Sequence, residues 1–433
     1  MRCADIAVIG AGPAGSAAAV TAARLGLDVV VLDRATFPRD KCCGDGLTSA
    51  CLRELEALGL EPGSVASWQP VHDVVLHSPA GRRIDLRLPD GPGSFSVVAR
   101  RIDLDASLVA LAVRAGAEVW EGEAVTSVDI SEDGAAVVVQ GTSRAVRAAV
   151  VVAADGMWSP TRKLCGAPHP RGYRGEWHAF RQYLDGAGPD ARTAQHIWFP
   201  TDLLPGYVWS FPLPGGAVNV GFGFPRSGRI AVGDGAALWG ELLARDEIRA
   251  VLGPDVRPAA PMRAWPIPAR VDEVSLSALA GRVLFVGDAA AAPDPMTGEG
   301  IAQALQTGRL AAESIATALA AGDGARPEVA LAAAASYRHA VRAELVADHR
   351  LARALSAVLA SSRRTEWSLR AVDGNDWTRR NFARWMFEDY PRALLGTPRR
   401  WRRGMFHRPG AYRTATVTRP LTAAAPPADP VSR

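Results

Sequence analysis

A glycine-rich turn close to the N-terminus constrains the fold of this chain more than any other feature of its sequence. The apolar run 6–9 predicts a short buried strand, and the small residues of 16–25 predict a helix. Between them lie Gly10, Gly12 and Gly15, in the pattern G-x-G-x-x-G. The first glycine permits a tight turn, the second lets the backbone approach a pyrophosphate, and the third lets the helix pack closely on the sheet. The pattern predicts a dinucleotide bound at the helix N-terminus, where backbone N–H groups and the helix dipole favour negative charge.

An acidic residue narrows the choice of dinucleotide. Asp33 follows a second predicted strand at 29–32, where its carboxylate can accept hydrogen bonds from a ribose. An acid at this place favours FAD or NAD, whereas Arg34 beside it would suit a phosphorylated ribose. We include Ala14 and Arg34, with the glycines and Asp33, among the candidate cofactor-binding residues.

Two motifs further along the chain favour FAD. Asp155-Gly156 and Gly287-Asp288 each follow an apolar, strand-like run. They resemble, in this order, the Asp-Gly and Gly-Asp motifs of flavoprotein hydroxylases and their relatives. The resemblance implies that Asp288 binds the ribityl chain of FAD. Arg101, in the pattern R-x-x-L-D, is similar to an arginine of the same proteins that helps to hold the cofactor.

The segment after Asp288 extends this resemblance. Pro295, Gly298 and Gly300 form the pattern P-x-x-G-x-G, and a predicted helix starts at Ile301. The resemblance implies that this turn and the helix N-terminus lie against the pyrimidine end of the isoalloxazine. A helix N-terminus at that place stabilises negative charge on the reduced flavin.

Two further motifs resemble those of a narrower family. Residues 38–47 read P-R-D-K-C-C-G-D-G-L and resemble the K-x-C-G-x-G-L segment of the geranylgeranyl reductase family. Residues 205–212 read P-G-Y-V-W-S-F-P and resemble its Y-x-W-x-F-P motif, and 220–223 resemble its G-x-G strand. The resemblance implies an FAD-dependent reductase of isolated prenyl double bonds, such as those of chlorophyll side chains, archaeal lipids and menaquinone. The chain departs from the family at Cys42, where proline is frequent, so the choice of the functional cysteine stays open.

The same motifs supply the candidate catalytic residues. Tyr207 and Trp209 alternate with Phe211 along a predicted strand, so the three rings face one side and could wall a lipid-sized pocket. An ordinary sheet core is the alternative. Cys43 is the candidate proton donor near the flavin, or else a small buried apolar side chain. Lys41 is expected to contact a phosphate or the anionic flavin, or to be a solvated loop charge. The expected cofactor-binding residues of this loop are Cys43 and Gly44.

Oxygen chemistry is the alternative function on the same fold. A flavin hydroperoxide would support hydroxylation or epoxidation, and a site with a lysine would support halogenation. Halogenases carry W-x-W-x-I-P where this chain has Y-V-W-S-F-P at 207–212, which disfavours halogenation. No second G-x-G-x-x-G follows a predicted strand, so the external reductant, NAD(P)H or another electron donor, is expected to bind only transiently.

The order of the segments predicts an α/β protein. We expect a Rossmann-like FAD-binding domain, interrupted by a mostly antiparallel β-sheet substrate domain and followed by C-terminal helices. The expected ranges are 1–70, 96–170 and 276–325 for the FAD-binding domain, 71–95 and 171–275 for the substrate domain, 326–415 for the helices, and 416–433 for a disordered tail.

Composition excludes several other classes of protein. The five cysteines include no C-x-x-C pair, so no metal site is expected and reduced thiols in a cytoplasm are the favoured interpretation. No uninterrupted run of 18 apolar residues predicts a membrane-spanning helix. The expected partner is a hydrophobic small molecule or lipid.

The segment 377–413 is strongly basic. It holds ten arginines against Glu388 and Asp389, with tryptophans between them. The favoured interpretation is a helical cap with a solvated basic face. Peripheral contact with the inner face of a membrane is the alternative, and nucleic acid is not expected.

Overall fold

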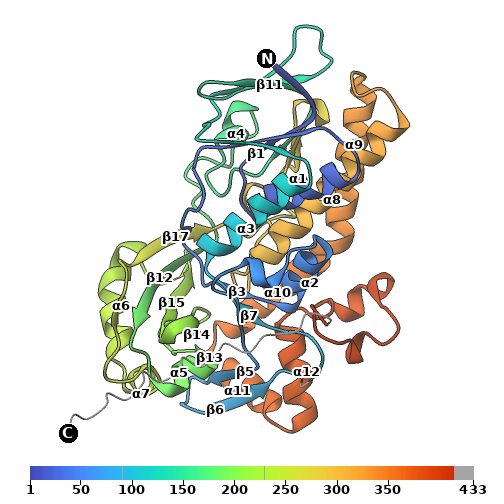
Figure 1. Ribbon diagram of the computed structural model, residues 1–433. Coiled ribbons are helices and arrows are strands. Elements are labelled where there is room, and N and C mark those ends of the chain that lie inside the picture. Colours follow the sequence, from blue (N-terminus) through green and yellow to red (C-terminus); the bar gives the residue numbers. More distant parts are fainter. Residues whose placement is uncertain (90, 229, 414–433) are drawn as a thin grey trace, which may run out of the picture.

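A largely parallel sheet is built around the glycine-rich turn. The computed structural model describes residues 1–89, 91–228 and 230–413 (Figure 1). The strand order is β18-β19-β11-β1-β2-β8, in which all neighbours pair in parallel except β18 with β19. The hairpin of β9 and β10 joins β11 in antiparallel fashion. The bounds are Arg2–Ile9 (β1), Val29–Asp33 (β2), Glu118–Glu121 (β8), Ser127–Ile130 (β9), Val137–Gln140 (β10), Ala145–Ala153 (β11), Ser277–Ala278 (β18) and Val283–Phe285 (β19).

Two helices pack against each other close to the glycine turn. They are α1 (Pro13–Arg24) and α8 (Ile301–Ala321). A methyl group on Gly308 of α8 would lie 2.1 Å from the carbonyl oxygen of Ala14 in α1. This approach requires glycine, because a Cβ atom would collide with the backbone. The start of α1 therefore lies against the first half of α8.

A second sheet follows the order β16-β12-β15-β14-β13-β5-β6, with β17 paired to β12. Its pairs are antiparallel except β13 with β5. Phe180, Phe222 and Phe224 pack on one face of it, and Trp239 stacks on Phe222. The bounds are Asp73–His77 (β5), Arg83–Arg87 (β6), Trp177–Asp185 (β12), Ala194–Trp198 (β13), Tyr207–Pro212 (β14), Val218–Pro225 (β15), Arg257–Pro258 (β16) and Arg263–Ile267 (β17).

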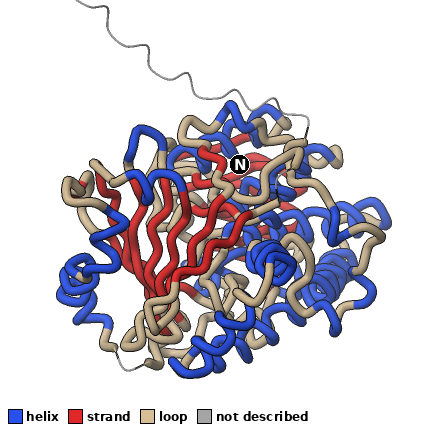
Figure 2. Tube along the Cα trace, turned by 90° about the horizontal axis from the view of Figure 1, so that it is seen from below, coloured by secondary structure: helices blue, strands red, loops and turns tan. Residues whose placement is uncertain are grey.

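A small third sheet connects these parts, and helices surround the strands (Figure 2). The small sheet contains Gly46–Leu47 (β3), Gln69–Pro70 (β4) and Val97–Val98 (β7). The remaining α-helices are Ser49–Ala57 (α2), Arg101–Arg114 (α3), Pro160–Leu164 (α4), Pro189–Thr193 (α5), Gly235–Ala244 (α6), Asp246–Leu252 (α7), Pro327–Val341 (α9), Ala347–Leu359 (α10), Ser362–Val372 (α11) and Asp376–Met386 (α12). A π-helical turn, Arg342–Val346, joins α9 to α10.

The predicted fold class is confirmed. A parallel sheet carries the glycine turn, a mostly antiparallel sheet lies beside it, and helices complete the C-terminal part. The expectation that 171–275 is mainly strand was incomplete, because α5, α6 and α7 lie within that range. We propose that the chain divides into domains along the two large sheets.

The basic C-terminal segment is less solvated than its sequence suggests. Arg384 and Arg392 are buried, the first paired with Asp389 and the second with Asp294 and Glu388. These two arginines therefore do not belong to the solvated face of the predicted helical cap, whereas Arg402 and Arg403 are exposed. The predicted disordered tail at 416–433 lies outside the described residues.

Across residues 1–89, 91–228 and 230–413, no helix is both long and apolar enough to cross a membrane.

Candidate functional site

A cavity of about 370 Å³ lies where the second sheet, the Cys43 loop, the segment that leads into α8 and the C-terminal helices meet. Many of the residues predicted from sequence motifs share its wall, although they are far apart in the chain. Those in the wall are Lys41, Cys43, Gly44, Arg101, Tyr207, Trp209, Asp288, Gly298, Gly300 and Ile301. The predicted residues Gly10, Gly12, Ala14, Gly15, Asp33, Arg34, Asp155, Gly287 and Pro295 lie outside the wall, and Pro13 links the glycine turn to it.

The glycine turn has the geometry that a pyrophosphate requires. A methyl group on Gly10 would lie 2.5 Å from the carbonyl oxygen of Ala154, and one on Gly15 would lie 1.8 Å from that of Gly10. A methyl group on Gly12 would meet only Nη2 of Arg39, at 3.6 Å. Close packing therefore requires glycine at positions 10 and 15. At Gly12 the backbone stays open to a ligand, and the guanidinium of Arg39 lies beside it. This cradle fits the diphosphate of FAD.

The acid at the C-terminal end of β2, Asp33, is held in place by the backbone. The N–H of Ala11 donates to Oδ2 of Asp33 at 2.7 Å, and that of Ala35 donates to Oδ1 at 2.8 Å. Each carboxylate oxygen keeps a second lone pair for a ribose hydroxyl. The neighbouring Arg34 is exposed.

Asp155 has a local structural role at the end of β11. Its carboxylate accepts hydrogen bonds from the Ser159 hydroxyl at 2.7 Å and from the N–H of Thr161 at 2.9 Å. Burial raises the pKa of this carboxyl. The Asp155-Gly156 turn adjoins Gly10, so its effect on a cofactor would be exerted through the shape of the glycine turn.

Asp288 and the start of α8 form the opposite side of the site. Nζ of Lys41 lies 3.2 Å from Oδ2 of Asp288, so this lysine is paired within the protein. The carboxylate of Glu299 accepts hydrogen bonds from the N–H groups of Ile301 and Ala302 at 3.0 and 3.1 Å, which caps the helix. Burial raises the pKa of Glu299 to about 7.

Arg101 is a buried part of an ion-pair chain. Its guanidinium makes two hydrogen bonds to Asp105, at 2.7 and 2.8 Å, and Nη1 of Arg39 lies 2.9 Å from the same carboxylate. Arg39 is the arginine that faces Gly12. This series of ion pairs, Arg101–Asp105–Arg39, therefore connects the cavity wall with the glycine turn.

The two neighbouring cysteines have different contacts, although both line the cavity. The N–H of Asp45 donates to Sγ of Cys43 at 3.4 Å, whereas Sγ of Cys42 donates to the carbonyl oxygen of Arg263 at 3.6 Å. Burial raises the pKa of Cys43 to about 11 and that of Cys42 to about 12. Both thiols therefore hold their protons at neutral pH.

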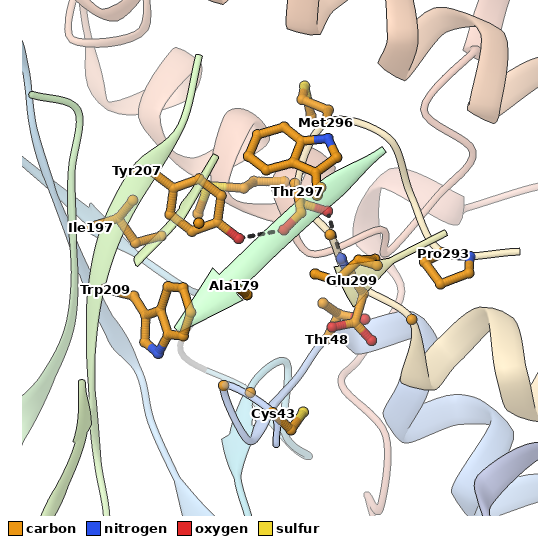
Figure 3. Close-up of a pocket in the computed structure, with 18 of the residues that line it drawn as sticks. Cys43, Thr48, Ala179, Ile197, Tyr207, Trp209, Pro293, Met296, Thr297 and Glu299 are labelled. Atoms are coloured by element: carbon orange, nitrogen blue, oxygen red, sulfur yellow. Dashed lines mark hydrogen bonds between the residues drawn. The ribbon is translucent and has the colours of Figure 1, made fainter. Parts of the chain in front are cut away.

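The aromatic side chains of β14 form one wall of the cavity. Tyr207, Trp209 and Phe211 all line it, with ring centroids 5.9 and 6.4 Å apart along the strand. The Tyr207 hydroxyl donates to the carbonyl oxygen of Thr297, and Figure 3 shows this contact next to Glu299. Nε1 of Trp209 donates to Oδ1 of Asn219 at 3.1 Å. The prediction that the three rings share one face is confirmed.

The far end of the cavity is apolar. Helices α10, α11 and α12 contribute aliphatic and aromatic side chains to it, namely Leu355, Val358, Leu359, Leu369, Val372, Phe382 and Met386. Such a lining excludes water and suits a hydrocarbon chain.

Sequence reasoning missed several residues of the site. Asp45 stands inside the recognised glycine-rich loop, and its charge among glycines was a usable signal. Asn219 precedes the G-x-G strand and Glu299 lies inside the P-x-x-G-x-G turn, so both could also have been noticed. Arg392 lines the cavity from far along the chain, and no local pattern marks it.

The fold and the cradle define an FAD-dependent oxidoreductase. A family model described as "FAD binding domain" matches residues 3–203. A menaquinone reductase of Mycolicibacterium smegmatis is 36% identical over 339 residues, covering 71% of this chain and 75% of that protein. A digeranylgeranylglycerophospholipid reductase of Methanopyrus kandleri is 32% identical over 326 residues, covering 71% and 75%. This chain belongs to the geranylgeranyl reductase family.

A solved structure supports the fold separately. A geranylgeranyl bacteriochlorophyll reductase-like protein of Thermoplasma acidophilum superposes with a TM-score of 0.74 at 22% identity, covering 93% of this chain and all of that one. At this identity the likeness concerns the fold alone.

Proposed function

We propose that this protein reduces carbon–carbon double bonds of a prenyl or polyprenyl substrate. The observation that carries the proposal is the cavity that joins the FAD-side residues to an apolar end walled by α10, α11 and α12. The named relatives act on a prenylated quinone and on prenylated glycerophospholipids, which supports a substrate of this class.

The cofactor would be held by residues from three parts of the chain. Gly12, Arg39 and the start of α1 would face the pyrophosphate, Asp33 the ribose, and Asp288 the ribityl chain. When bound and reduced, FAD supplies the hydride for the reaction. The external reductant, which we expect to be NAD(P)H or another donor, would visit the same site transiently.

The residues of the cavity would orient the substrate and supply a proton. Tyr207 and Trp209 would hold a double bond in a site without water, which is where positioning contributes most to the rate. The Cys43 thiol holds its proton because of its raised pKa, and we assign to it the transfer of that proton to the second alkene carbon. Lys41 would move from Asp288 toward negative charge on the cofactor.

An anaerobic single turnover tests this function. The protein is loaded with FAD, reduced chemically and mixed without oxygen with a geranylgeranylated lipid or a menaquinone extract. The proposal predicts that the yellow absorbance of oxidised flavin returns only when substrate is added. If the flavin stays reduced until oxygen enters and an oxygenated product then forms, the reductase assignment fails in favour of a monooxygenase.

We also propose peripheral membrane contact through the 377–413 segment. Trp377, Trp401 and Phe406 are exposed there, and so are Arg402 and Arg403. Exposed aromatics beside arginines favour an anionic lipid surface. Vesicles with anionic lipid should sediment the protein and neutral vesicles should not, and a Trp377→Ala, Trp401→Ala variant should bind more weakly. Equal sedimentation of parent and variant would contradict this contact.

A further inference from the structure

We propose that Asp45 is the positioning residue that holds the Cys43 loop in register with the aromatic wall of β14. This inference deepens the proposed reduction, because it concerns the placement of its proton donor. Asp45 lies in the cavity wall, where we assign it a positioning role and no proton transfer to the substrate. Its carboxylate joins the loop to two strands of the second sheet and to the start of α3.

The contacts of Asp45 link the loop to three elements. The Tyr183 hydroxyl, on β12, donates to Oδ2 of Asp45 at 2.7 Å, and Nδ2 of Asn219, on β15, donates to the same oxygen at 2.8 Å. The N–H of Arg101, at the start of α3, donates to Oδ1 at 3.2 Å. The Asp45 side chain is completely buried, so water does not compete for these bonds.

The same residue holds both partners of the proposed reaction site. On one side, the N–H of Asp45 donates to Sγ of Cys43 at 3.4 Å. On the other, Asn219 donates to Asp45 and to the carbonyl oxygen of Cys43 at 2.9 Å, and it accepts from Nε1 of Trp209 at 3.1 Å. Trp209 and Cys43 are therefore tied together through Asn219 and Asp45.

The loop is shaped for this contact at a conformational cost. Asp45 has a φ of 64°, in the left-handed region that non-glycine residues rarely adopt. Its neighbours are glycines that lie under the rings: a methyl group on Gly44 would be 3.5 Å from Trp209, and one on Gly46 would be 3.1 Å from Phe211. An aspartate in a strained conformation, where glycine would be relaxed, indicates that its side chain is needed there.

The charges around Asp45 support an ionised anchor. Burial raises its pKa to about 6, whereas Tyr183, Asn219 and the guanidinium of Arg181 on β12 oppose that rise. The charged groups that face Cys43 are Asp45 itself, Arg101 and Glu299. Asp45 is therefore ionised at neutral and alkaline pH, and its charge adds to the burial that raises the pKa of Cys43.

The test measures the reactivity of Cys43 in full-length protein without substrate. In a Cys42→Ser background, alkylation of Cys43 by iodoacetamide is followed by peptide mass spectrometry across the alkaline pH range. Variant and parent are compared at pH values where the same fraction of Cys43 is thiolate. Under these conditions Asp45→Ala should raise the rate of Cys43 alkylation by about tenfold or more, which corresponds to about 1.4 kcal/mol of lost anchoring. Asp45→Asn keeps an oxygen that can accept from Tyr183 and Asn219, and it should restore most of the protection. Its neutral side chain should also move the alkylation midpoint to lower pH.

A control separates positioning from general loosening. Cys51, buried on α2, reports global opening and should stay unreacted in every variant. With a substrate, Asp45→Ala should lower kcat while KM changes little, and Asp45→Asn should recover part of kcat. An unchanged Cys43 rate in Asp45→Ala, or equal exposure of Cys51, would overturn the proposal. Alkylation of Cys43 needs no turnover. The positioning role of Asp45 can therefore be tested even if the protein proves not to be a reductase.

Discussion

Cys42 and Cys43 are neighbours in the chain, but their surroundings predict different roles. Sγ of Cys43 accepts from the Asp45 N–H, whereas Sγ of Cys42 bonds to the backbone of β17. We expect Cys43→Ser to lower the rate of substrate reduction by about a hundredfold or more, the range in which general acids contribute. Cys42→Ser should stay within about threefold of the parent. Both variants should bind FAD as the parent does, measured by absorbance, and equal loss in both would contradict the assignment.

Glu299 makes a prediction about the pH dependence of stability. Its pKa is about 7 in the folded protein because of burial, above the value of an unfolded glutamate. The folded state therefore binds this proton more tightly, and the stability it contributes is complete at acidic pH and is lost as pH rises to about 7. Glu299→Gln should lose less stability between about pH 5 and pH 8 than the parent, by on the order of 1–3 kcal/mol.

Urea unfolding at the two pH values measures this difference. Glu132→Gln, at an exposed turn, is the matched control and should keep the pH profile of the parent. A Glu299→Gln variant with the parent's profile would show that this carboxyl does not titrate in the expected range.

At the residue scale, motifs predicted which residues gather but not how they are paired. Lys41 and Asp288 were both predicted for the cofactor site, and the structure places them in contact with each other. Asp45 and Arg392 were not predicted, since a buried carboxylate or guanidinium acquires its role from partners on distant elements. That information lies in the fold and not in the local pattern.

At the scale of elements, the contact of α1 with α8 depends on Gly308. A methyl group there would collide with the carbonyl oxygen of Ala14. We expect Gly308→Ala to destabilise the protein by about 2–3 kcal/mol and to weaken FAD binding, because α1 would be pushed from the glycine turn.

Gly240 provides the matched control for this substitution. It lies in α6 and is exposed, and a methyl group added there would meet no other atom within 4 Å. Gly240→Ala should stabilise the protein by about 0.5–1 kcal/mol, since alanine favours helix more than glycine does. Denaturant unfolding compares the two, and a neutral Gly308→Ala would contradict the packing argument.

The elements with strong apolar periodicity were predicted well, whereas the helices α6 and α12 were missed. The strands at 6–9 and 29–32 and the helix from Ile301 match β1, β2 and α8. α6 was missed because Gly235 and Gly240 lower its helix propensity, although it packs on the second sheet through Trp239. α12 has a capping box of Asn375 and Thr378 that the sequence does display, so it could have been found.

At the scale of the whole molecule, buried ion pairs attach the C-terminal segment to the rest. Nη1 of Arg392 lies 2.6 Å from Oδ2 of Asp294, in the loop before α8, and Nη2 lies 3.1 Å from Glu388. Although burial opposes it, the guanidinium holds the pKa of Asp294 below its usual range. Arg392 therefore links the end of α12, which lines the cavity, to the loop before α8.

Loss of this arginine would leave the buried carboxylates of Asp294 and Glu388 without the positive charge that they pair with. We expect Arg392→Met to cost about 3–5 kcal/mol of unfolding free energy, the range for breaking a buried pair. Arg402→Met, at an exposed site, should change it by less than about 0.5 kcal/mol. Thermal unfolding distinguishes the two, and similar melting temperatures would contradict the role of Arg392.

The central claim is that the cavity serves reduction of a prenyl double bond. The mass of the product tests this claim most directly. Protein loaded with FAD is given a reductant, air and either a geranylgeranylated lipid or a menaquinone extract, and the lipid is analysed by mass spectrometry. We predict a gain of two hydrogen atoms for each bond reduced, and slower accumulation of this product with Cys43→Ser. A gain of one oxygen atom would contradict the claim and identify a monooxygenase.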